Sequence, residues 1–281
     1  MTAPAGGLTT TVGLIASDRQ LIDRTRQAAL ELGVDLHVLA PPGGKVTSSA
    51  TANHGPDCPD DLGHLIGSAA RCDVVTFESS AISASHREIL FSAGITLRPG
   101  PQAAELADDS TTARQVLRDC GFDVVAIPDT VGDDPLGLQQ SNIAARRRSP
   151  SGAMWVGQLN VVVARRPSGL RVVYPVVETG RGGRLHLAPT TLAVTPASTA
   201  EHAVGAAISI ADGIDATGII TVNFLLAADK RPFVNSILLG LHPQPHTISD
   251  PARTSQIENH LRAILDWPLG TAKIETPTRR P

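Results

Sequence analysis

Cysteine, aromatic side chains and excess charge are all scarce in this sequence of 281 residues. Its three cysteines, Cys58, Cys72 and Cys120, have no close spacing, which indicates reduced thiols rather than a disulfide framework or a zinc site. Aromatic residues make up only 3% of the chain, so platforms for stacking nucleic-acid bases are not expected. A net charge of -3 offers a polyanion little attraction, which argues against a nucleic-acid or membrane-surface partner.

Long hydrophobic runs are missing as well. The first residues, 1–8, lack the charged and apolar regions of a signal peptide. No apolar run approaches the roughly 20 residues that a bilayer span needs. The sequence therefore predicts a cytoplasmic protein without a membrane partner, and its 42% hydrophobic content is enough for a substantial core.

Strands and helices alternate in the first part of the chain. Short apolar runs typical of strands occupy 10–16, 34–40 and 72–78. Segments with apolar residues at helical spacing follow them at 18–32, 60–70 and 83–93, and Asp18 is a plausible N-cap for the first. This alternation predicts an α/β domain with a parallel sheet over residues 1–102.

The later part of the chain has a different pattern. A helical connector is expected at 103–127, and a polar stretch without periodicity at 128–153 predicts a flexible loop. Residues 154–270 then contain strand pairs, including a hairpin from Gly218 to Leu239, and residues 271–281 form a tail. A mainly antiparallel sheet is therefore predicted for 154–270.

A loop and a helix follow the hairpin. His242 and His246 lie in a segment whose two prolines exclude a helix, so their spacing of four does not place both rings on one helical face. Ser255 and Glu258 form a capping box ahead of apolar residues at helical spacing. A packed helix is predicted to close this unit.

Several of these stretches together carry a family resemblance. They are Arg71–Glu78, Thr96–Pro101, Thr254–Leu265 and Pro268–Gly270. In them the chain resembles the ATP-grasp carboxyaminoimidazole ribonucleotide synthases, the ATPase subunit of phosphoribosylaminoimidazole carboxylase. The resemblance implies an N-terminal pre-ATP-grasp domain, then an ATP-grasp domain with a mainly antiparallel sheet, and a homodimer.

The chain departs from that family where phosphates are handled. The family's two magnesium-binding glutamates of the hairpin correspond to Asn223 and Ser236, and a third glutamate corresponds to Gln158. The glycine-rich turn after the first strand reads Ala16–Gln20 and has no glycine. The segment 128–153 is expected to be too short for the family's ATP lid lobe, and the family's basic C-terminal subdomain is expected to be missing. The sequence is thus expected to be a truncated, degenerate member with neither a metal ion nor a cofactor.

Candidate site residues follow from the resemblance and from polar groups at strand ends. We expect His242, His246 and Glu78 to carry protons, since imidazole titrates near neutral pH. The residues expected to bind a small-molecule substrate are Asn223, Asn235, Glu178, His186 and Ser80. For Glu78, Glu178 and the histidines a purely structural role is an open alternative.

Three functions are consistent with this pattern. The first is an ATP-independent enzyme of the isomerase or lyase type, which would use acid/base chemistry on a small metabolite of a specialised biosynthetic pathway. The second is a non-catalytic pseudoenzyme that binds a metabolite or a partner protein. The third is a minimal carboxyaminoimidazole ribonucleotide synthase of purine biosynthesis. The sequence favours the first because the phosphate-handling residues have changed.

Overall fold

The structure is a computed structural model of the whole chain. It describes residues 10–42, 61–78, 81–101, 103–104, 115, 117–118, 121, 155–179, 191–192, 195–242 and 254–273.

The N-terminal part is a parallel sheet with helices. Its strands are β1 (Thr11–Ile15), β2 (Asp35–Leu39) and β3 (Val74–Phe77), which pair in the order β2-β1-β3 with both pairings parallel. The helices between and after them are α1 (Arg19–Leu32), α2 (Asp61–Ala69) and α3 (Ala84–Ser92). The predicted alternation of strands and helices is therefore confirmed.

Local sequence signals set the ends of α1. The Asp18 side chain accepts a hydrogen bond from the Leu21 backbone N–H at 2.7 Å, as expected for an N-cap. Gly33 ends the helix with φ of 70°, a left-handed conformation that glycine adopts without a Cβ clash. The buried side chains of α1, among them Leu21 and Ile22, lie on the side that packs against the sheet.

The second sheet is antiparallel. Its strands are β4 (Trp155–Arg165), β5 (Arg171–Val173), β6 (Val177–Thr179), β7 (Thr191–Leu192), β8 (Gly218–Ala227) and β9 (Pro232–Leu239). The order is β7-β6-β4-β8-β9, and β5 pairs with β4 beside this path. The hairpin β8–β9 lies where the sequence predicted it. The α/β fold, with a parallel N-terminal sheet and a mainly antiparallel second sheet, is as predicted.

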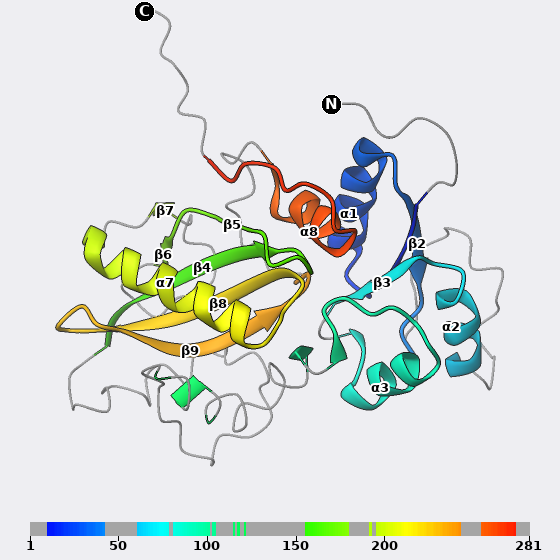
Figure 1. Cartoon of the computed structure of the whole chain (residues 1–281), viewed down its shortest axis with the longest axis horizontal. Coiled ribbons are helices and arrows are strands. Elements are labelled where there is room, and N and C mark those ends of the chain that lie inside the picture. Colours follow the sequence, from blue (N-terminus) through cyan, green and yellow to red (C-terminus); the bar gives the residue numbers. More distant parts are fainter. Residues whose placement is uncertain are drawn as a thin grey trace, which may run out of the picture.

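Helix α7 (Ala197–Gly213) covers one face of this sheet (Figure 1). Every second residue of β4, namely Leu159, Val161 and Val163, is fully buried and belongs to the cluster that includes the alanines of α7. Small side chains such as Ala203 and Ala207 let the helix lie close to the strands. The residues between them, such as Asn160 and Val162, point to the opposite face of the sheet.

Helix α8 (Gln256–Ile264) joins the two sheets (Figure 1). Its residues Leu261 and Ile264 are buried in one cluster with Val12 of β1 and Ala28 of α1. The Arg98 guanidinium donates at 2.7 Å to the Ile264 carbonyl, a favourable place for a cation at the end of a helix. The N-cap half of the capping box predicted at its start is present, with Ser255 accepting from the Glu258 N–H at 3.0 Å.

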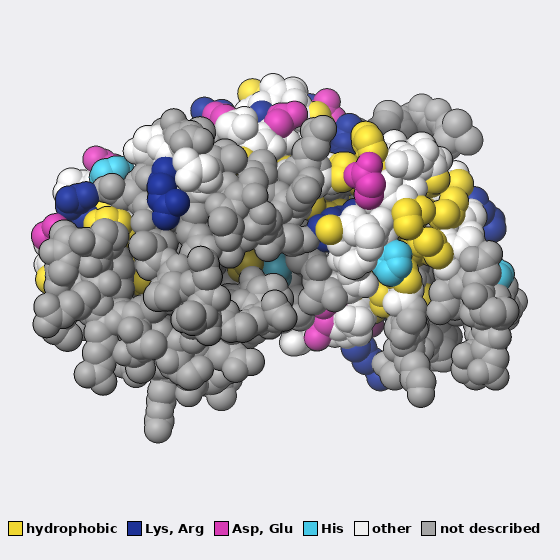
Figure 2. Space-filling view, turned by 90° about the horizontal axis from the view of Figure 1, so that it is seen from below, with side chains coloured by type: hydrophobic (Ala, Val, Ile, Leu, Met, Phe, Trp, Pro, Cys, Tyr) yellow, Lys and Arg dark blue, Asp and Glu magenta, His cyan; other side chains and the backbone are white. Residues whose placement is uncertain are grey.

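An apolar area lies on one face of the described part of the molecule. Seen from below, hydrophobic side chains gather over the part of the molecule that holds α2 and α3 (Figure 2). On α3, Ile89 is 40% exposed and Phe91 is 53% exposed. Within the described ranges, no helix is both long enough and apolar enough to cross a bilayer.

Candidate functional site

Glu78 directly follows β3, at the edge of the parallel sheet where strand ends often bind ligands. It is only 2% exposed, and one of its carboxylate oxygens accepts three hydrogen bonds. The donors are the Ser17 N–H at 2.8 Å, the Ser17 hydroxyl at 3.3 Å and the Asp18 N–H at 3.1 Å. The carboxylate therefore occupies backbone donors of the turn that precedes α1, where an anionic ligand would otherwise be attracted.

The histidine segment begins beside Glu78. Leu241 forms an isolated parallel bridge with Glu78, and His242, which is half-buried, is the next residue. Gly240 has φ of 75°, and a Cβ at this position would lie 3.2 Å from the Phe77 carbonyl oxygen. A glycine is needed here for the chain to leave β9 and pass the end of β3. The structure thus brings Glu78 and the backbone of His242 to one junction between the two sheets.

Three of the predicted site residues, His246, His186 and Ser80, lie outside the described residues. Their roles stay predictions, as do the proton-carrying roles of Glu78 and His242.

A row of neutral polar side chains crosses the face of the antiparallel sheet away from α7. Asn160 of β4 is opposite Asn223 of β8, which in turn is opposite Ser236 of β9. Directly opposed residues of antiparallel strands share a face, and Gln158 shares it because it is two residues from Asn160. All four side chains are half-buried. We call Gln158, Asn160, Asn223 and Ser236 the amide row.

Within the amide row, the Asn223 amide donates a hydrogen bond of 2.9 Å to the Ser236 hydroxyl. The register shifts immediately afterwards, since Phe224 pairs with Val234. Asn235 is the extra residue of the resulting β-bulge. Asn223 and Asn235 were both predicted to bind substrate. Asn223 forms the cross-strand pair with Ser236, and Asn235 directly precedes Ser236 in β9.

Glu178 lies on the other face of this sheet. It is opposite Leu159, whose fully buried side chain belongs to the α7 core. Its carboxylate accepts a hydrogen bond of 3.0 Å from the Thr195 hydroxyl, just ahead of α7. The structure does not bring Glu178 together with Asn223, although both were predicted to bind substrate.

The amide row does not fit a magnesium site built on carboxylates. Magnesium prefers anionic oxygen ligands, whereas Asn223 and Ser236 are neutral and hydrogen-bonded to each other. Among the residues whose placement is described, no three His, Cys, Asp or Glu side chains are grouped so that they could hold a metal ion.

His260 of α8 is a buried residue that the sequence did not single out. Its ring is fully buried, with Nδ1 accepting from the Ile219 N–H at 3.1 Å and Nε2 lying 2.8 Å from the Thr76 hydroxyl. Since Nδ1 accepts, the neutral ring carries its proton on Nε2 and donates to Thr76. Burial lowers the pKa of His260 from 6.5 to about 3. A neutral imidazole thus bridges β3 of the first sheet and β8 of the second.

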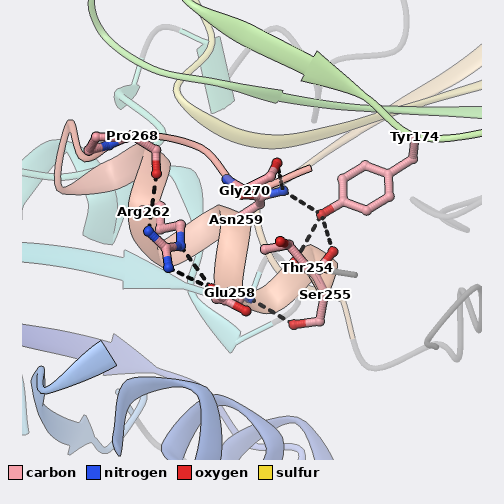
Figure 3. A network of polar contacts seen from close by, with 8 residues as sticks. All are labelled: Tyr174, Thr254, Ser255, Glu258, Asn259, Arg262, Pro268 and Gly270. Atoms are coloured by element: carbon pink, nitrogen blue, oxygen red, sulfur yellow. Dashed lines mark hydrogen bonds and ion pairs between the residues drawn. The ribbon is translucent and has the colours of Figure 1, made fainter. Parts of the chain in front are cut away.

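A second buried network centres on Tyr174, between β5 and β6 (Figure 3). Its hydroxyl lies 2.9 Å from the Ser255 carbonyl and accepts from the Asn259 amide at 2.8 Å. Asn259 also receives the Gly270 N–H at 2.8 Å and donates to the Gly270 carbonyl at 3.1 Å. Burial raises the pKa of Tyr174, and the hydrogen bond from Asn259 opposes this. The network fixes α8 and the segment after it against the antiparallel sheet.

No family model matches the sequence. Individual relatives do match it. The chain is 30% identical to N5-carboxyaminoimidazole ribonucleotide synthase of Mycobacterium tuberculosis over 296 residues, which cover 92% of this chain and 69% of the relative. It is 26% identical to the synthase of the same name from Synechococcus elongatus, with 95% and 76% covered.

Solved structures show the same fold. The N5-carboxyaminoimidazole ribonucleotide synthetase of Thermotoga maritima superposes with a TM-score of 0.69 at 20% identity, over 95% of this chain and 78% of that one. The Aspergillus clavatus synthase in complex with ADP and 5-aminoimidazole ribonucleotide gives a TM-score of 0.71 at 18% identity, over 94% and 78%.

These relatives correct two expectations. An ATP-independent enzyme of the isomerase or lyase type was predicted from the altered phosphate-handling residues. That prediction is wrong, since the relatives are synthases and solved members hold ADP or ATP. Asn223 and Ser236 are therefore compatible with membership of this family. With 30% identity over most of its length, this chain belongs to the N5-carboxyaminoimidazole ribonucleotide synthase family.

Proposed function

We propose that this chain is an ATP-dependent ligase that carboxylates aminoimidazole ribonucleotide, as the names of its relatives describe. The observation that carries this proposal is the match of 30% identity over 92% of the chain. The two-sheet frame, with a polar junction between the sheets, supports it.

The junction supplies groups suited to a ribonucleotide. The carboxylate of Glu78 is buried and held by the turn before α1, so its position is fixed before any ligand arrives. A carboxylate held in this way accepts hydrogen bonds from hydroxyl or amino groups. His242 enters the same junction beside Leu241. We therefore assign the ribonucleotide to this junction, and the nucleotide to the amide-row face of the second sheet.

The test is ADP release by the purified protein with ATP, magnesium and bicarbonate, measured with and without aminoimidazole ribonucleotide. The proposal expects ADP release that depends on the ribonucleotide, together with incorporation of ¹³C from bicarbonate. Glu78→Gln removes the charge at the junction and should weaken the stimulation by the ribonucleotide. ADP release that is the same with and without the ribonucleotide would refute the proposal.

A second candidate is a non-catalytic family member that binds the ligands without converting them. The hydrogen bond between Asn223 and Ser236 favours it, since this neutral pair stands where the resemblance places two carboxylates. Calorimetric binding of ADP and of the ribonucleotide, with no turnover in the assay above, would select this candidate.

A homodimer is implied by the family resemblance and stays a prediction. Light scattering of the purified chain at several concentrations gives its mass directly.

A further inference from the structure

We propose that this chain binds its nucleotide without a divalent ion ligated by the protein, using the neutral amide row in place of a metal site. This inference rests on the proposed function, since it concerns how the same site holds the nucleotide. It comes from the disagreement between a magnesium-dependent family and the side chains that this chain places on the sheet.

The amide row is continuous across three strands. Asn160, Asn223 and Ser236 are successive partners in register on β4, β8 and β9. Gln158 extends the row along β4. Opposed side chains on neighbouring antiparallel strands have Cβ atoms about 5 Å apart, so the row presents carbonyl, amide and hydroxyl groups at regular spacing.

None of these four side chains carries a charge. A magnesium ion keeps several water ligands and is usually held through one or two carboxylates together with substrate phosphates. The row offers neutral oxygens only, and its central pair is already hydrogen-bonded at 2.9 Å. Binding a metal ion there would gain no anionic ligand.

The carboxylate of Glu178 does not supply the anionic ligand that the amide row lacks. Glu178 is on the opposite face of the sheet and accepts from the Thr195 hydroxyl at 3.0 Å. Within the part of the chain that the structure describes, no grouping of acidic and histidine residues suits a metal ion.

Amides and hydroxyls are nevertheless good partners for a nucleotide. The amide groups of Gln158, Asn160 and Asn223 can each donate to phosphate oxygens, and donation does not require a cation between protein and phosphate. Magnesium that accompanies ATP is then held by the phosphates and water alone. Nucleotide affinity should therefore depend little on magnesium.

Isothermal calorimetry of ADP binding, with excess magnesium and then with excess EDTA, tests this directly. The expected result for the native chain is a Kd that changes by less than about threefold. The variant carrying Asn223→Glu and Ser236→Glu restores two carboxylates. Its Kd for ADP should be more than about tenfold lower in magnesium than in EDTA, which corresponds to about 1.4 kcal/mol of binding free energy.

A charge-matched control separates ligation from general electrostatics. Ala197→Glu with Ser198→Glu also adds two carboxylates, at exposed positions in the first turn of α7, across the sheet from the amide row. This control should bind ADP with the same small magnesium dependence as the native chain. Electron paramagnetic resonance of Mn²⁺ needs no variant: native protein with ADP should bind Mn²⁺ no more tightly than ADP does alone.

The outcomes are distinct. Native binding of ADP that is more than about tenfold tighter in magnesium, or tight Mn²⁺ binding to the native complex, overturns the inference and leaves the proposed function standing. Magnesium-independent ADP binding without ribonucleotide-dependent turnover supports the inference while refuting the proposed function. No ADP binding in either condition overturns both.

Discussion

Acid should destabilise this protein through His260. The ring is fully buried, and burial lowers its pKa from 6.5 to about 3. As the pH falls below about 6.5, the unfolded chain takes up a proton on this residue while the folded chain does not. The free energy of unfolding therefore decreases with falling pH, and this loss is complete only near the folded pKa of about 3.

The size of the effect follows from the two pKa values. At about pH 5, the histidine is almost fully protonated in the unfolded chain and almost fully neutral in the folded chain. The resulting loss of stability, relative to about pH 8, is about 2 kcal/mol. A side chain at position 260 that makes similar hydrogen bonds but does not titrate should not show this loss of stability.

Urea unfolding at about pH 8 and about pH 5, followed by circular dichroism, measures the effect. His260→Gln serves as the comparison, because glutamine keeps a donor and an acceptor but has no proton to gain. The decrease in unfolding free energy should be smaller in this variant by about 2 kcal/mol. Equal decreases in the native chain and the variant would refute the reasoning.

An NMR measurement tests the same point without a variant. The imidazole nitrogens of His260 should keep the shifts of a neutral ring, with the proton on Nε2, throughout the range from about pH 8 to about pH 5. A ring that becomes charged in the folded protein above about pH 5 would contradict the assignment.

Three further predictions concern the buried contacts. Tyr174→Phe removes one of the two acceptors of the Asn259 amide and should reduce the free energy of unfolding by about 1–3 kcal/mol, measured in urea. Gly218→Ala should destabilise the protein, because the residue has φ of 102° and a Cβ would lie 2.8 Å from the His260 ring. In this variant, thermal unfolding at a temperature close to the native one would contradict the structure. Glu78→Gln keeps an acceptor but removes the charge at the start of α1, and should lower the free energy of unfolding by about 1–2 kcal/mol in a urea titration. Glu88→Gln, at an exposed position of α3, removes a carboxylate as well and serves as the control, with no change in stability expected.

Elements with strong local signals could be predicted from the sequence. Asp18 and Ser255 are N-caps as their sequence contexts indicated, since capping depends on residues only three positions away. The hairpin of β8 and β9 also follows from two β-rich runs and a turn. The reciprocal half of the capping box was harder to foresee, because the Glu258 carboxylate pairs with Arg262 at 2.8 Å.

Contacts between distant segments could not be predicted. His260 meets Thr76 across 184 positions, and no local period signals such a pair. The face that Glu178 occupies depends on its register with β4, and a shift of one residue would turn it to the other side. Glu78 was expected in a site, but its anchoring by the turn before α1 depends on the pairing of β1 with β3.

The functional prediction failed for a related reason. The prediction of an ATP-independent enzyme rested on four features together: the turn at Ala16–Gln20 without glycine, the short segment 128–153, the expected lack of a basic C-terminal subdomain, and neutral residues at Asn223 and Ser236. Residues 223 and 236 affect how a metal ion could be held. The family, in contrast, is shown by 30% sequence identity over 92% of the chain. Our proposal is that Asn223 and Ser236 change how the nucleotide is held, and the calorimetry in magnesium and in EDTA tests it.

The position of α8 has a consequence for biosynthesis of the protein. Val12 and Ala28 near the start of the chain complete their core only with Leu261 and Ile264 near its end. During translation, this apolar side of the first sheet stays uncovered until α8 has emerged from the ribosome. Fragments that stop before residue 254 should therefore aggregate, and chaperone dependence should fall sharply once α8 is released.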